Sequence, residues 1–334
     1  MFGLTILLTM KKKLLLSLFS LSILAAHAQK VIHTYAIASA GGWDYIAVNQ
    51  DKIYVSHGTQ VNILNKATGD SVGVILNTTG VHGIAFDNMS GKGYTSNGRL
   101  NNVTVFDLAT HAVLGQIATG ANPDAIMYEP FTKTIITCNG RSNDLSVINV
   151  ATQQVIATIP VGGKPETAVS DNAGKVFVNI EDKSEIAVID LTTKTVINRW
   201  SLAPGEGPSG LAIDLATKRL FSTCDKLLVV MDATNGKIIA KLPIGDGTDG
   251  VAFDNATKTI YASNGEGTIT AIKETDADHF SVSATIPTRR GARTIAIDES
   301  THTLYLPTAE FEANTPKGQR PKMIPGTFQV LVVN

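Results

Sequence analysis

The feature that most constrains the fold is an internal repeat with a period of about 40 residues. Residues 81–98, VHGIAFDNMSGKGYTSNG, and residues 248–265, TDGVAFDNATKTIYASNG, are identical at half of their eighteen positions. Related openings recur along the chain, and from Asp44 onward they are spaced by 38, 42, 42, 43, 40 and 44 residues. A period of this length is typical of β-propellers, in which each repeat forms one four-stranded sheet.

Each unit has the pattern of four short strands separated by polar turns. In the second unit the apolar stretch HGIAFD (82–87) is followed by the turn NMSGK, then by GYTSNG, VTVFD and AVLGQIAT. Asp or Asn begins most of the turns, because its side chain can hydrogen-bond the backbone of the bend. The intervals between strands are too short and lack the 3.6-residue periodicity of crossover helices, which argues against an α/β fold.

The seventh unit is short of one strand. Residues 30–42 have the same pattern as the fourth strands of other units, such as QVIATIPVGGK (154–164), and can complete it. This pairing would close the ring and remove the free edges of an open array. The sequence therefore predicts an all-β fold with one domain over residues 29–334. The domain is a seven-bladed β-propeller of four-stranded antiparallel blades, with the N-terminal strand pairing in the last blade.

The second strands of the units carry a common motif: IYVSHG (53–58), GYTSNG (93–98), ITCNG (136–140) and IYASNG (260–265). These stretches resemble the YVTN-type motif of the YVTN/YncE-like β-propeller repeat family, whose members are exported bacterial proteins. The resemblance covers essentially the whole chain after the leader and implies the same seven-bladed fold. It implies no particular activity, because members share architecture more firmly than chemistry.

Residues 1–28 have the pattern of a signal peptide. Three lysines precede an apolar run, and the small-residue triplet AHA ends the segment. We expect cleavage after Ala28 and export to the periplasm or the medium. We expect translation to start at Met10, so that residues 1–9 result from a start codon assigned too far upstream. The apolar run is short for a membrane span, and no transmembrane segment is expected after cleavage.

Composition narrows the classes of partner. The formal net charge of −1 falls by three when the leader lysines are removed. Nucleic acid and anionic membrane surfaces are therefore not expected partners. Cys138 and Cys224 lie in units that are not neighbours, so we predict unpaired core cysteines rather than a disulfide. The chain has no CxxCH motif for covalent haem, and no cofactor is predicted.

Candidate functional residues recur where one unit leads into the next. In a propeller these junctions, together with the loops between second and third strands, surround one mouth of the central channel. Equivalent junction positions carry Asp44, His82, Asp124, Glu166, Ser209, Asp249 and Arg293. The neighbouring loops and the first junction add His57, Asn97, Asn139, Asn264 and Trp43. We predict that the mouth formed by these side chains binds a ligand.

Converging carboxylates raise one another's pKa unless a cation lies among them. Arg293 is one candidate cation, and a bound divalent ion is another. The oxygen ligands for a hard ion would be Asp44, Asp124, Glu166 and Asp249. The chain has no Asp-rich loop with calcium-binding spacing, so a divalent cation stays an alternative to an internal counter-charge.

Three aromatic side chains at the predicted mouth each have two interpretations. His57 and His82 lie in adjacent units, where they could bind a transition metal or act as acid and base. Ordinary hydrogen-bonded histidines are the competing interpretation. Trp43 could stack on a sugar or another flat ligand, or it could be a wedge between blades.

Residues 309–326 break the pattern of the repeat. This segment is an insert between the second and third strands of the seventh unit and contains three prolines. A long loop in a compact domain is usually functional or disordered. We predict that it forms a lid over the mouth, with Lys317, Arg320 and Lys322 facing the acidic side chains.

Two interpretations of function stay open, and neither assigns a catalytic residue. The first is a monomeric envelope protein that binds a small polar ligand or a protein partner at the mouth, or acts as a scaffold. It is favoured because no nucleophile, base and orienting group stand at recognisable spacing. The second is a cation-assisted hydrolase, lactonase-like or carbohydrate-acting, that uses the same mouth.

Overall fold

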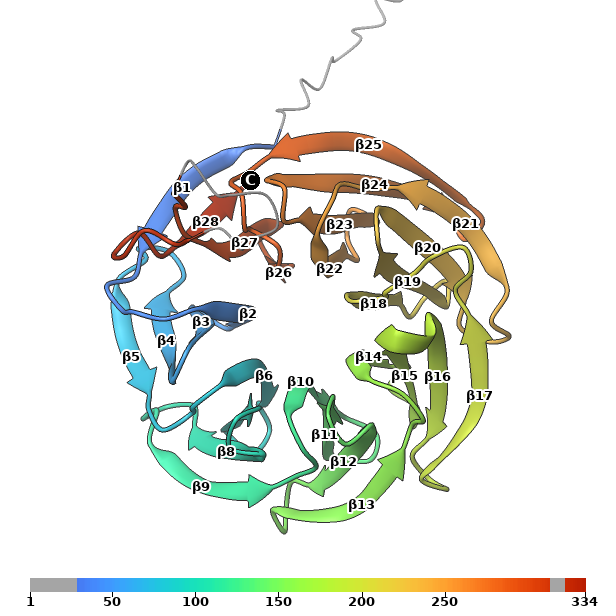
Figure 1. Ribbon diagram of the computed structural model, residues 1–334, viewed down its shortest axis with the longest axis horizontal. Coiled ribbons are helices and arrows are strands. Elements are labelled where there is room, and N and C mark those ends of the chain that lie inside the picture. The colour runs from blue at the N-terminus through green and yellow to red at the C-terminus, as the bar shows by residue number, and fades with distance from the viewer. Residues whose placement is uncertain (1–28, 313–321) are drawn as a thin grey trace, which may run out of the picture.

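The structure is a computed structural model that describes residues 29–312 and 322–334. Over these residues the chain forms 28 strands in seven four-stranded sheets, and its helical structure is limited to one 3-10 turn, η1 (Glu181–Lys183). The sheets stand like blades around a central channel, with the first strand of each blade innermost (Figure 1). The prediction of a seven-bladed propeller with antiparallel blades is confirmed.

Blades 1 to 3 follow chain order from the channel outward. Blade 1 contains β2 (Trp43–Asn49), β3 (Lys52–His57), β4 (Gln60–Asn65) and β5 (Ser71–Ile75). Blade 2 contains β6 (Val81–Asp87), β7 (Lys92–Asn97), β8 (Asn102–Asp107) and β9 (Val113–Ala118). Blade 3 contains β10 (Pro123–Glu129), β11 (Thr134–Asn139), β12 (Asp144–Asn149) and β13 (Gln154–Pro160).

Blades 4 to 6 repeat this order. Blade 4 contains β14 (Pro165–Ser170), β15 (Lys175–Ile180), β16 (Glu185–Asp190) and β17 (Thr195–Ser201). Blade 5 contains β18 (Leu211–Asp214), β19 (Arg219–Cys224), β20 (Leu227–Asp232) and β21 (Ile238–Pro243). Blade 6 contains β22 (Thr248–Asp254), β23 (Thr259–Asn264), β24 (Thr268–Asp276) and β25 (His279–Pro287).

Blade 7 joins the two ends of the chain. Its inner strands are β26 (Ala296–Asp298), β27 (Thr303–Thr308) and β28 (Gln329–Val333), and its outermost strand is β1 (Val31–Ala36). β1 runs antiparallel to β28, with Val31 opposite Val333 and Ala36 opposite Gln329. Figure 1 shows β1 completing the outer edge of this blade. The predicted closure is therefore confirmed.

Strand register assigns the loops to two faces. In blade 1, Trp43 is opposite His57 at one end of the β2–β3 pair, and Asn49 is opposite Lys52 at the other end. The junctions between blades and the loops between second and third strands therefore lie on one face, which we call the mouth face. The other turns lie on the opposite face.

The hydrophobic core is divided among the interfaces between blades. Within the described residues it forms seven clusters, each combining side chains of two adjacent blades. Between blades 3 and 4, for example, Ile136 and Cys138 pack with Val176 and Val178. Cys224 is buried in the cluster between blades 4 and 5. Both cysteines have free thiols, as predicted, and serve as small core residues.

Aspartate and asparagine stabilise the turns as their recurrence suggested. Oδ1 of Asp107 accepts hydrogen bonds from the backbone N–H groups of Ala109 (3.0 Å) and Thr110 (2.7 Å). Asn149 makes the equivalent pair of bonds in blade 3, from Ala151 and Thr152. The same chemistry therefore ends the third strand of successive blades.

The insert of blade 7 lies between β27 and β28. Its two described arms run antiparallel: Phe311 and Met323 form a β-bridge, and the N–H of Glu312 donates to the carbonyl of Lys322 at 2.9 Å. The predicted lid residues Lys317 and Arg320 lie outside the described residues. Nζ of Lys322 lies 3.1 Å from Oε1 of Glu312, so this lysine pairs within the insert and not with a carboxylate of the mouth.

None of the helical structure in the described part of the chain is long and apolar enough to cross a membrane.

Candidate functional site

A local irregularity directs the junction residues toward the channel. The register of the innermost strand shifts just after the strand begins, over residues 43–46, 81–84, 123–126, 165–168 and 248–250. Asp44, His82 and Asp124 lie inside these shifts. A bulge of this kind bends the strand and redirects a side chain away from the regular alternation. The repeated bulge thus places one polar side chain of each of these blades at the mouth.

Three of the predicted residues form a contiguous cluster across blades 1 to 3. Nδ1 of His82 lies 2.5 Å from Oδ2 of Asp44 and 3.6 Å from Oδ1 of Asp124. Burial opposes protonation of this imidazole, but the hydrogen bond with Asp44 and the charge of Asp124 raise the pKa of His82 overall. His82 therefore acts as a positive or hydrogen-bonding bridge between two carboxylates.

Arg293 links the other side of the mouth to the same cluster. Its Nε donates to Oδ2 of Asp249 at 2.7 Å, and its NH2 group lies 3.5 Å from Oδ1 of Asp44. The NH2 group also donates to the carbonyl of Trp43 at 3.3 Å. Arg293 is therefore the internal counter-charge that the sequence suggested, and it connects blades 6, 7 and 1.

Lys164 is a mouth residue that sequence reasoning missed. Its Nζ lies 3.1 Å from Oε2 of Glu166 and makes a shorter contact with Glu181 in the adjacent loop. It stands two positions before Glu166, where Gly80 and Gly247 occupy the equivalent sites of blades 2 and 6. A charged residue at a position that is glycine in most other blades and Asn122 in blade 3 was the available signal.

Burial raises the pKa values of the mouth carboxyls more than the nearby cations lower them. It raises the pKa of Asp124 to about 6, with Asp44 adding to the rise and His82 opposing it. Burial likewise raises the pKa of Glu166 to about 8, with Asp124 as the next cause and Lys164 opposing. The pKa of Asp249 is raised by burial despite Arg293. Hence the cations of the mouth do not offset the cost of burying these charges.

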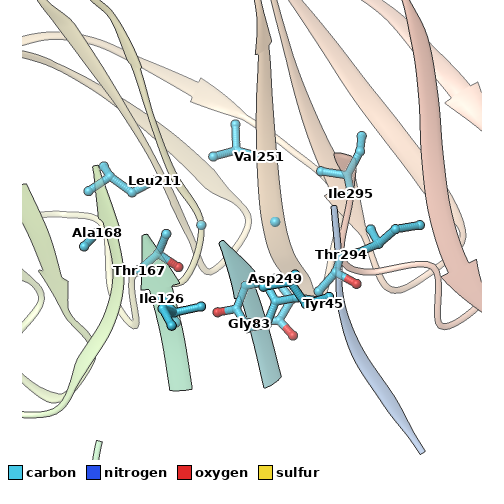
Figure 2. A pocket seen from close by; sticks show the side chains of 15 residues that line it. Tyr45, Gly83, Ile126, Thr167, Ala168, Leu211, Asp249, Val251, Thr294 and Ile295 are labelled. Atoms are coloured by element: carbon cyan, nitrogen blue, oxygen red, sulfur yellow. The ribbon is translucent and has the colours of Figure 1, made fainter. Parts of the chain in front are cut away.

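The central channel contains a cavity of about 190 Å³. Three residues of blade 6 and two residues of each other blade line it, and most of them are small or aliphatic (Figure 2). A Cβ at Gly83 would lie 2.8 Å from Cγ2 of Ile126, so glycine allows the blades to approach closely here. Tyr45 reaches across from blade 1 and packs against the cluster between blades 3 and 4.

The negative charges of the mouth act on the hydroxyl of Tyr45. Burial raises the pKa of Tyr45 well above its usual range, and the charges of Asp124, Glu166, Asp44 and Asp249 raise it further. The hydroxyl therefore stays protonated and can donate a hydrogen bond. The charged side chains of the mouth thus stand near a phenol, that of Tyr45, which lines the cavity of the channel.

The structure corrects the placement of His57. This side chain is fully buried, and its ring stacks on Phe328 with 4.0 Å between ring centres. Nδ1 lies 2.5 Å from the hydroxyl of Ser39, and Nε2 lies 2.8 Å from the carbonyl of Gly41. Burial lowers the pKa of His57. Both nitrogens are occupied, so His57 is a structural histidine that holds the N-terminal segment and does not face the mouth.

The three predicted asparagines are also interior residues. Asn97, Asn139 and Asn264 are fully buried. Nδ2 of Asn139 donates to Oδ1 of Asp144 (2.7 Å) and to the hydroxyl of Ser146 (2.9 Å), which fastens the loop between second and third strands. Asn97 and Asn264 make equivalent pairs of bonds in blades 2 and 6. These side-chain amides form hydrogen bonds inside their own loops, and the structure therefore corrects the prediction that they bind a ligand.

Trp43 takes the packing role rather than the stacking role. Its ring lies 5.3 Å from Phe328 and 6.1 Å from Phe311, between blade 1 and the insert of blade 7. The guanidinium of Arg293 lies 5.9 Å from the centre of the ring, within range of a cation–π interaction. Trp43 therefore packs among Phe311, Phe328 and Arg293 at the boundary between blades 1 and 7.

Fold and site together define a seven-bladed β-propeller with a charged channel mouth, and comparison with solved structures agrees on the fold. The chain is similar to hydrazine synthase of Kuenenia stuttgartiensis, with a TM-score of 0.73 and 14% identity over 88% of this chain and 97% of that chain. At this identity the likeness concerns the fold alone. Neither a protein-family model nor a curated protein sequence matches the chain.

Proposed function

We propose that this chain is an exported envelope protein whose channel mouth binds a small polar ligand through a positively charged group. The single observation that carries the proposal is the shortage of positive charge at the mouth. Asp124 and Glu166 have raised pKa values although His82 and Lys164 stand beside them. A bound cation would lower these pKa values and recover part of the cost of burial.

The size of the cavity limits the ligand. A volume of about 190 Å³ is below the range of roughly 300–1,000 Å³ that is typical of drug-sized ligands. Tyr45 and, from the polar ring, Asp249 line this cavity, and only a small molecule, or one charged group of a larger partner, fits into it. A protonated amine that also donates and accepts hydrogen bonds meets these limits.

The experiment is a thermal-shift screen of the purified protein with small amines, amino sugars, neutral sugars and carboxylates. A ligand that binds only the native state, at 100 times its dissociation constant, stabilises it by about 2.7 kcal/mol, which raises the melting temperature by roughly 4 °C for a protein of this size. We expect the shift with cationic compounds and its loss in Asp249→Asn. Asp276→Asn, which changes an exposed carboxylate of blade 6, is the matched control.

Two results would refute this proposal. One is stabilisation by neutral sugars or carboxylates with no response to cationic compounds. The other is an equal response of the wild type and Asp249→Asn to every cationic compound. Export is tested separately, because the exported form is expected to begin at Gln29 when its N-terminus is sequenced.

A second candidate function, cation-assisted hydrolysis, is favoured by the contact of His82 with two carboxylates. An imidazole held by a carboxylate is able to act as a general base toward water, and a cation beside it would polarise an ester or lactone carbonyl. The test is lactone hydrolysis with and without added divalent ions. Turnover that His82→Asn abolishes would support this candidate, and turnover that survives the change would exclude it.

A further inference from the structure

We propose that the mouth holds one divalent transition-metal ion between Asp44, His82 and Asp124. This inference rests on the proposed function, because it names the positive charge that the mouth binds. One ligand atom from each of the three side chains lies within 4.8 Å of the other two. The side chains are largely buried, with exposed fractions of 19% for Asp44 and 14% for Asp124. The three residues come from three blades, so the rigid ring fixes their separation.

The distances are close to those of a metal centre. Zinc lies about 2.0–2.2 Å from nitrogen and carboxylate ligands, so two ligands on one tetrahedral ion are roughly 3.3 Å apart. The separation of 3.6 Å between His82 Nδ1 and Asp124 Oδ1 is near this value. The separation of 2.5 Å between His82 Nδ1 and Asp44 Oδ2 is that of a hydrogen bond. A small rotation of the imidazole would exchange this hydrogen bond for a shared ion.

A histidine–aspartate pair on the opposite face shows what a purely structural arrangement looks like. There Nδ1 of His302 lies 2.8 Å from Oδ2 of Asp254. Thr257 also hydrogen-bonds Asp254, and the pKa of this carboxyl is lowered although burial opposes the shift. At the mouth, a second carboxylate, that of Asp124, lies 3.6 Å from the same imidazole nitrogen. The mouth cluster thus brings two carboxylates and one imidazole together, whereas the pair on the opposite face has a single carboxylate.

Glu166, the next residue of the ring after Asp124, is buried, and its Oε2 lies 3.1 Å from Nζ of Lys164. This ion pair already gives Glu166 a positively charged partner, so Glu166 is not counted among the metal ligands.

The donor set selects the class of metal. Imidazole favours zinc, copper, iron and nickel, whereas calcium and magnesium prefer sites made only of oxygen. One imidazole with two carboxylates therefore suits a divalent ion such as Zn²⁺ or Mn²⁺. Three protein ligands leave a coordination position open toward the mouth, as in catalytic rather than structural zinc sites. That position is where a small ligand of the mouth would bind.

The test is Zn²⁺ titration by calorimetry of the tag-free protein, after chelation and desalting. We expect one Zn²⁺ per chain and a loss of affinity of at least about tenfold in His82→Asn and in Asp124→Asn. His302→Asn is the matched control, since it makes the same change in the His–Asp pair of the opposite face, and it should bind Zn²⁺ like the wild type. Circular dichroism of each variant checks that it is folded.

Replacing Zn²⁺ by Co²⁺ gives a visible spectrum that would not change if His82 had only a structural role. The wild type should show the visible absorption of low-symmetry Co²⁺, and His82→Asn should not. The inference is overturned if the wild type binds no Zn²⁺, or if both mouth variants bind it as tightly as the wild type. If cationic compounds still stabilise a protein that binds no Zn²⁺, the metal inference fails and the proposed function stands. If neither Zn²⁺ nor any cationic compound binds, both fail.

Discussion

The two faces of the propeller use buried charges in opposite ways. On the opposite face, Asp214 is paired with Lys258 of the next blade at 2.8 Å, and Asp298 is paired with Lys66 at 2.6 Å. Burial opposes ionisation at both sites, but the lysine hydrogen bonds lower the pKa of each carboxyl. At the mouth, the pKa values of Asp124 and Glu166 are raised.

This difference teaches which charges hold the ring together. A carboxyl with a lowered pKa in the folded protein stabilises the fold when it is ionised, and one with a raised pKa destabilises it. The cross-blade pairs of the opposite face therefore act as fasteners between neighbouring sheets. Carboxylates that reduce stability are candidates for function, because strongly perturbed groups in a cleft cluster at functional sites.

Removal of Lys258 is expected to have the largest effect. Lys258→Met leaves Asp214 without its cation, and Asp214 and Glu274 beside it are 1% and 3% exposed. Loss of one partner from a buried ion pair is costly, and we expect the free energy of unfolding to fall by about 2–3 kcal/mol. Urea denaturation at pH 7 measures the change.

Lys133→Met is the control for this prediction. Lys133 occupies the equivalent turn of blade 3 with the same left-handed backbone, and its side chain is exposed. A surface change of this kind should alter stability by less than about 0.5 kcal/mol. Equal effects of the two substitutions would show that the Lys258 pair is not a fastener.

Removal of Lys66 is expected to have a smaller, pH-dependent effect. The hydrogen bond from Lys66 is the main cause, against burial, that lowers the pKa of Asp298 to about 2. Because a lowered carboxyl pKa gives stability that is complete above the unfolded pKa near 3.9, Lys66→Met should cost about 1–2 kcal/mol at pH 7. The cost should shrink as the pH falls from 4 toward 2.

Urea titrations at pH 7 and pH 3 measure the difference between Lys66→Met and the wild type. Lys52→Met is the control, because Lys52 pairs at 2.8 Å with Asp51, whose side chain is 68% exposed. Exposed pairs of this kind contribute little. A cost for Lys66→Met that is constant from pH 7 to pH 3 would contradict the assignment to Asp298.

The ring positions of the mouth could be predicted from the sequence because they follow from the fold alone. Once the repeat fixed the junctions, Asp44, His82, Asp124, Asp249 and Arg293 occupied equivalent places around one axis, and the structure brings them together. Periodicity carries this information, since five of the seven blades repeat the same bulge. The closure of blade 7 could be predicted for the same reason, because an incomplete unit needs a strand.

The roles of individual loop residues could not be predicted, because they depend on contacts that no local pattern encodes. His57 is covered by Phe328, which the closing blade brings from the far end of the chain. The asparagines use their amides to fasten their own loops, and a turn asparagine has the same sequence signal whether it faces inward or outward. Lys164 contacts Glu166 and Glu181 from a position that is glycine in most other blades, so the repeat gives no precedent for this contact.

The smallest expected effect has the opposite sign and lies at the mouth. Glu166→Gln removes the carboxylate whose burial raises its pKa to about 8. Because a raised carboxyl pKa lowers stability progressively between the unfolded pKa near 4.3 and the folded value of about 8, the variant should be more stable than the wild type by about 1 kcal/mol at pH 9. At pH 4 the two proteins should be equally stable, since Glu166 is then mostly protonated in both states.

The same substitution on the opposite face gives the sharpest contrast. Glu129 is fully buried. Its Oε2 accepts from the N–H (2.7 Å) and the hydroxyl (2.5 Å) of Thr132, and its Oε1 accepts from Ser170 of the next blade (3.1 Å). A glutamine there would place an NH₂ group against donors, so Glu129→Gln should lose about 1 kcal/mol. Urea titrations of both variants at pH 9 decide the matter. If both Glu166→Gln and Glu129→Gln were destabilised, the mouth carboxylates would hold the ring together as those of the opposite face do. The argument that the mouth is a functional site would then lose its physical basis.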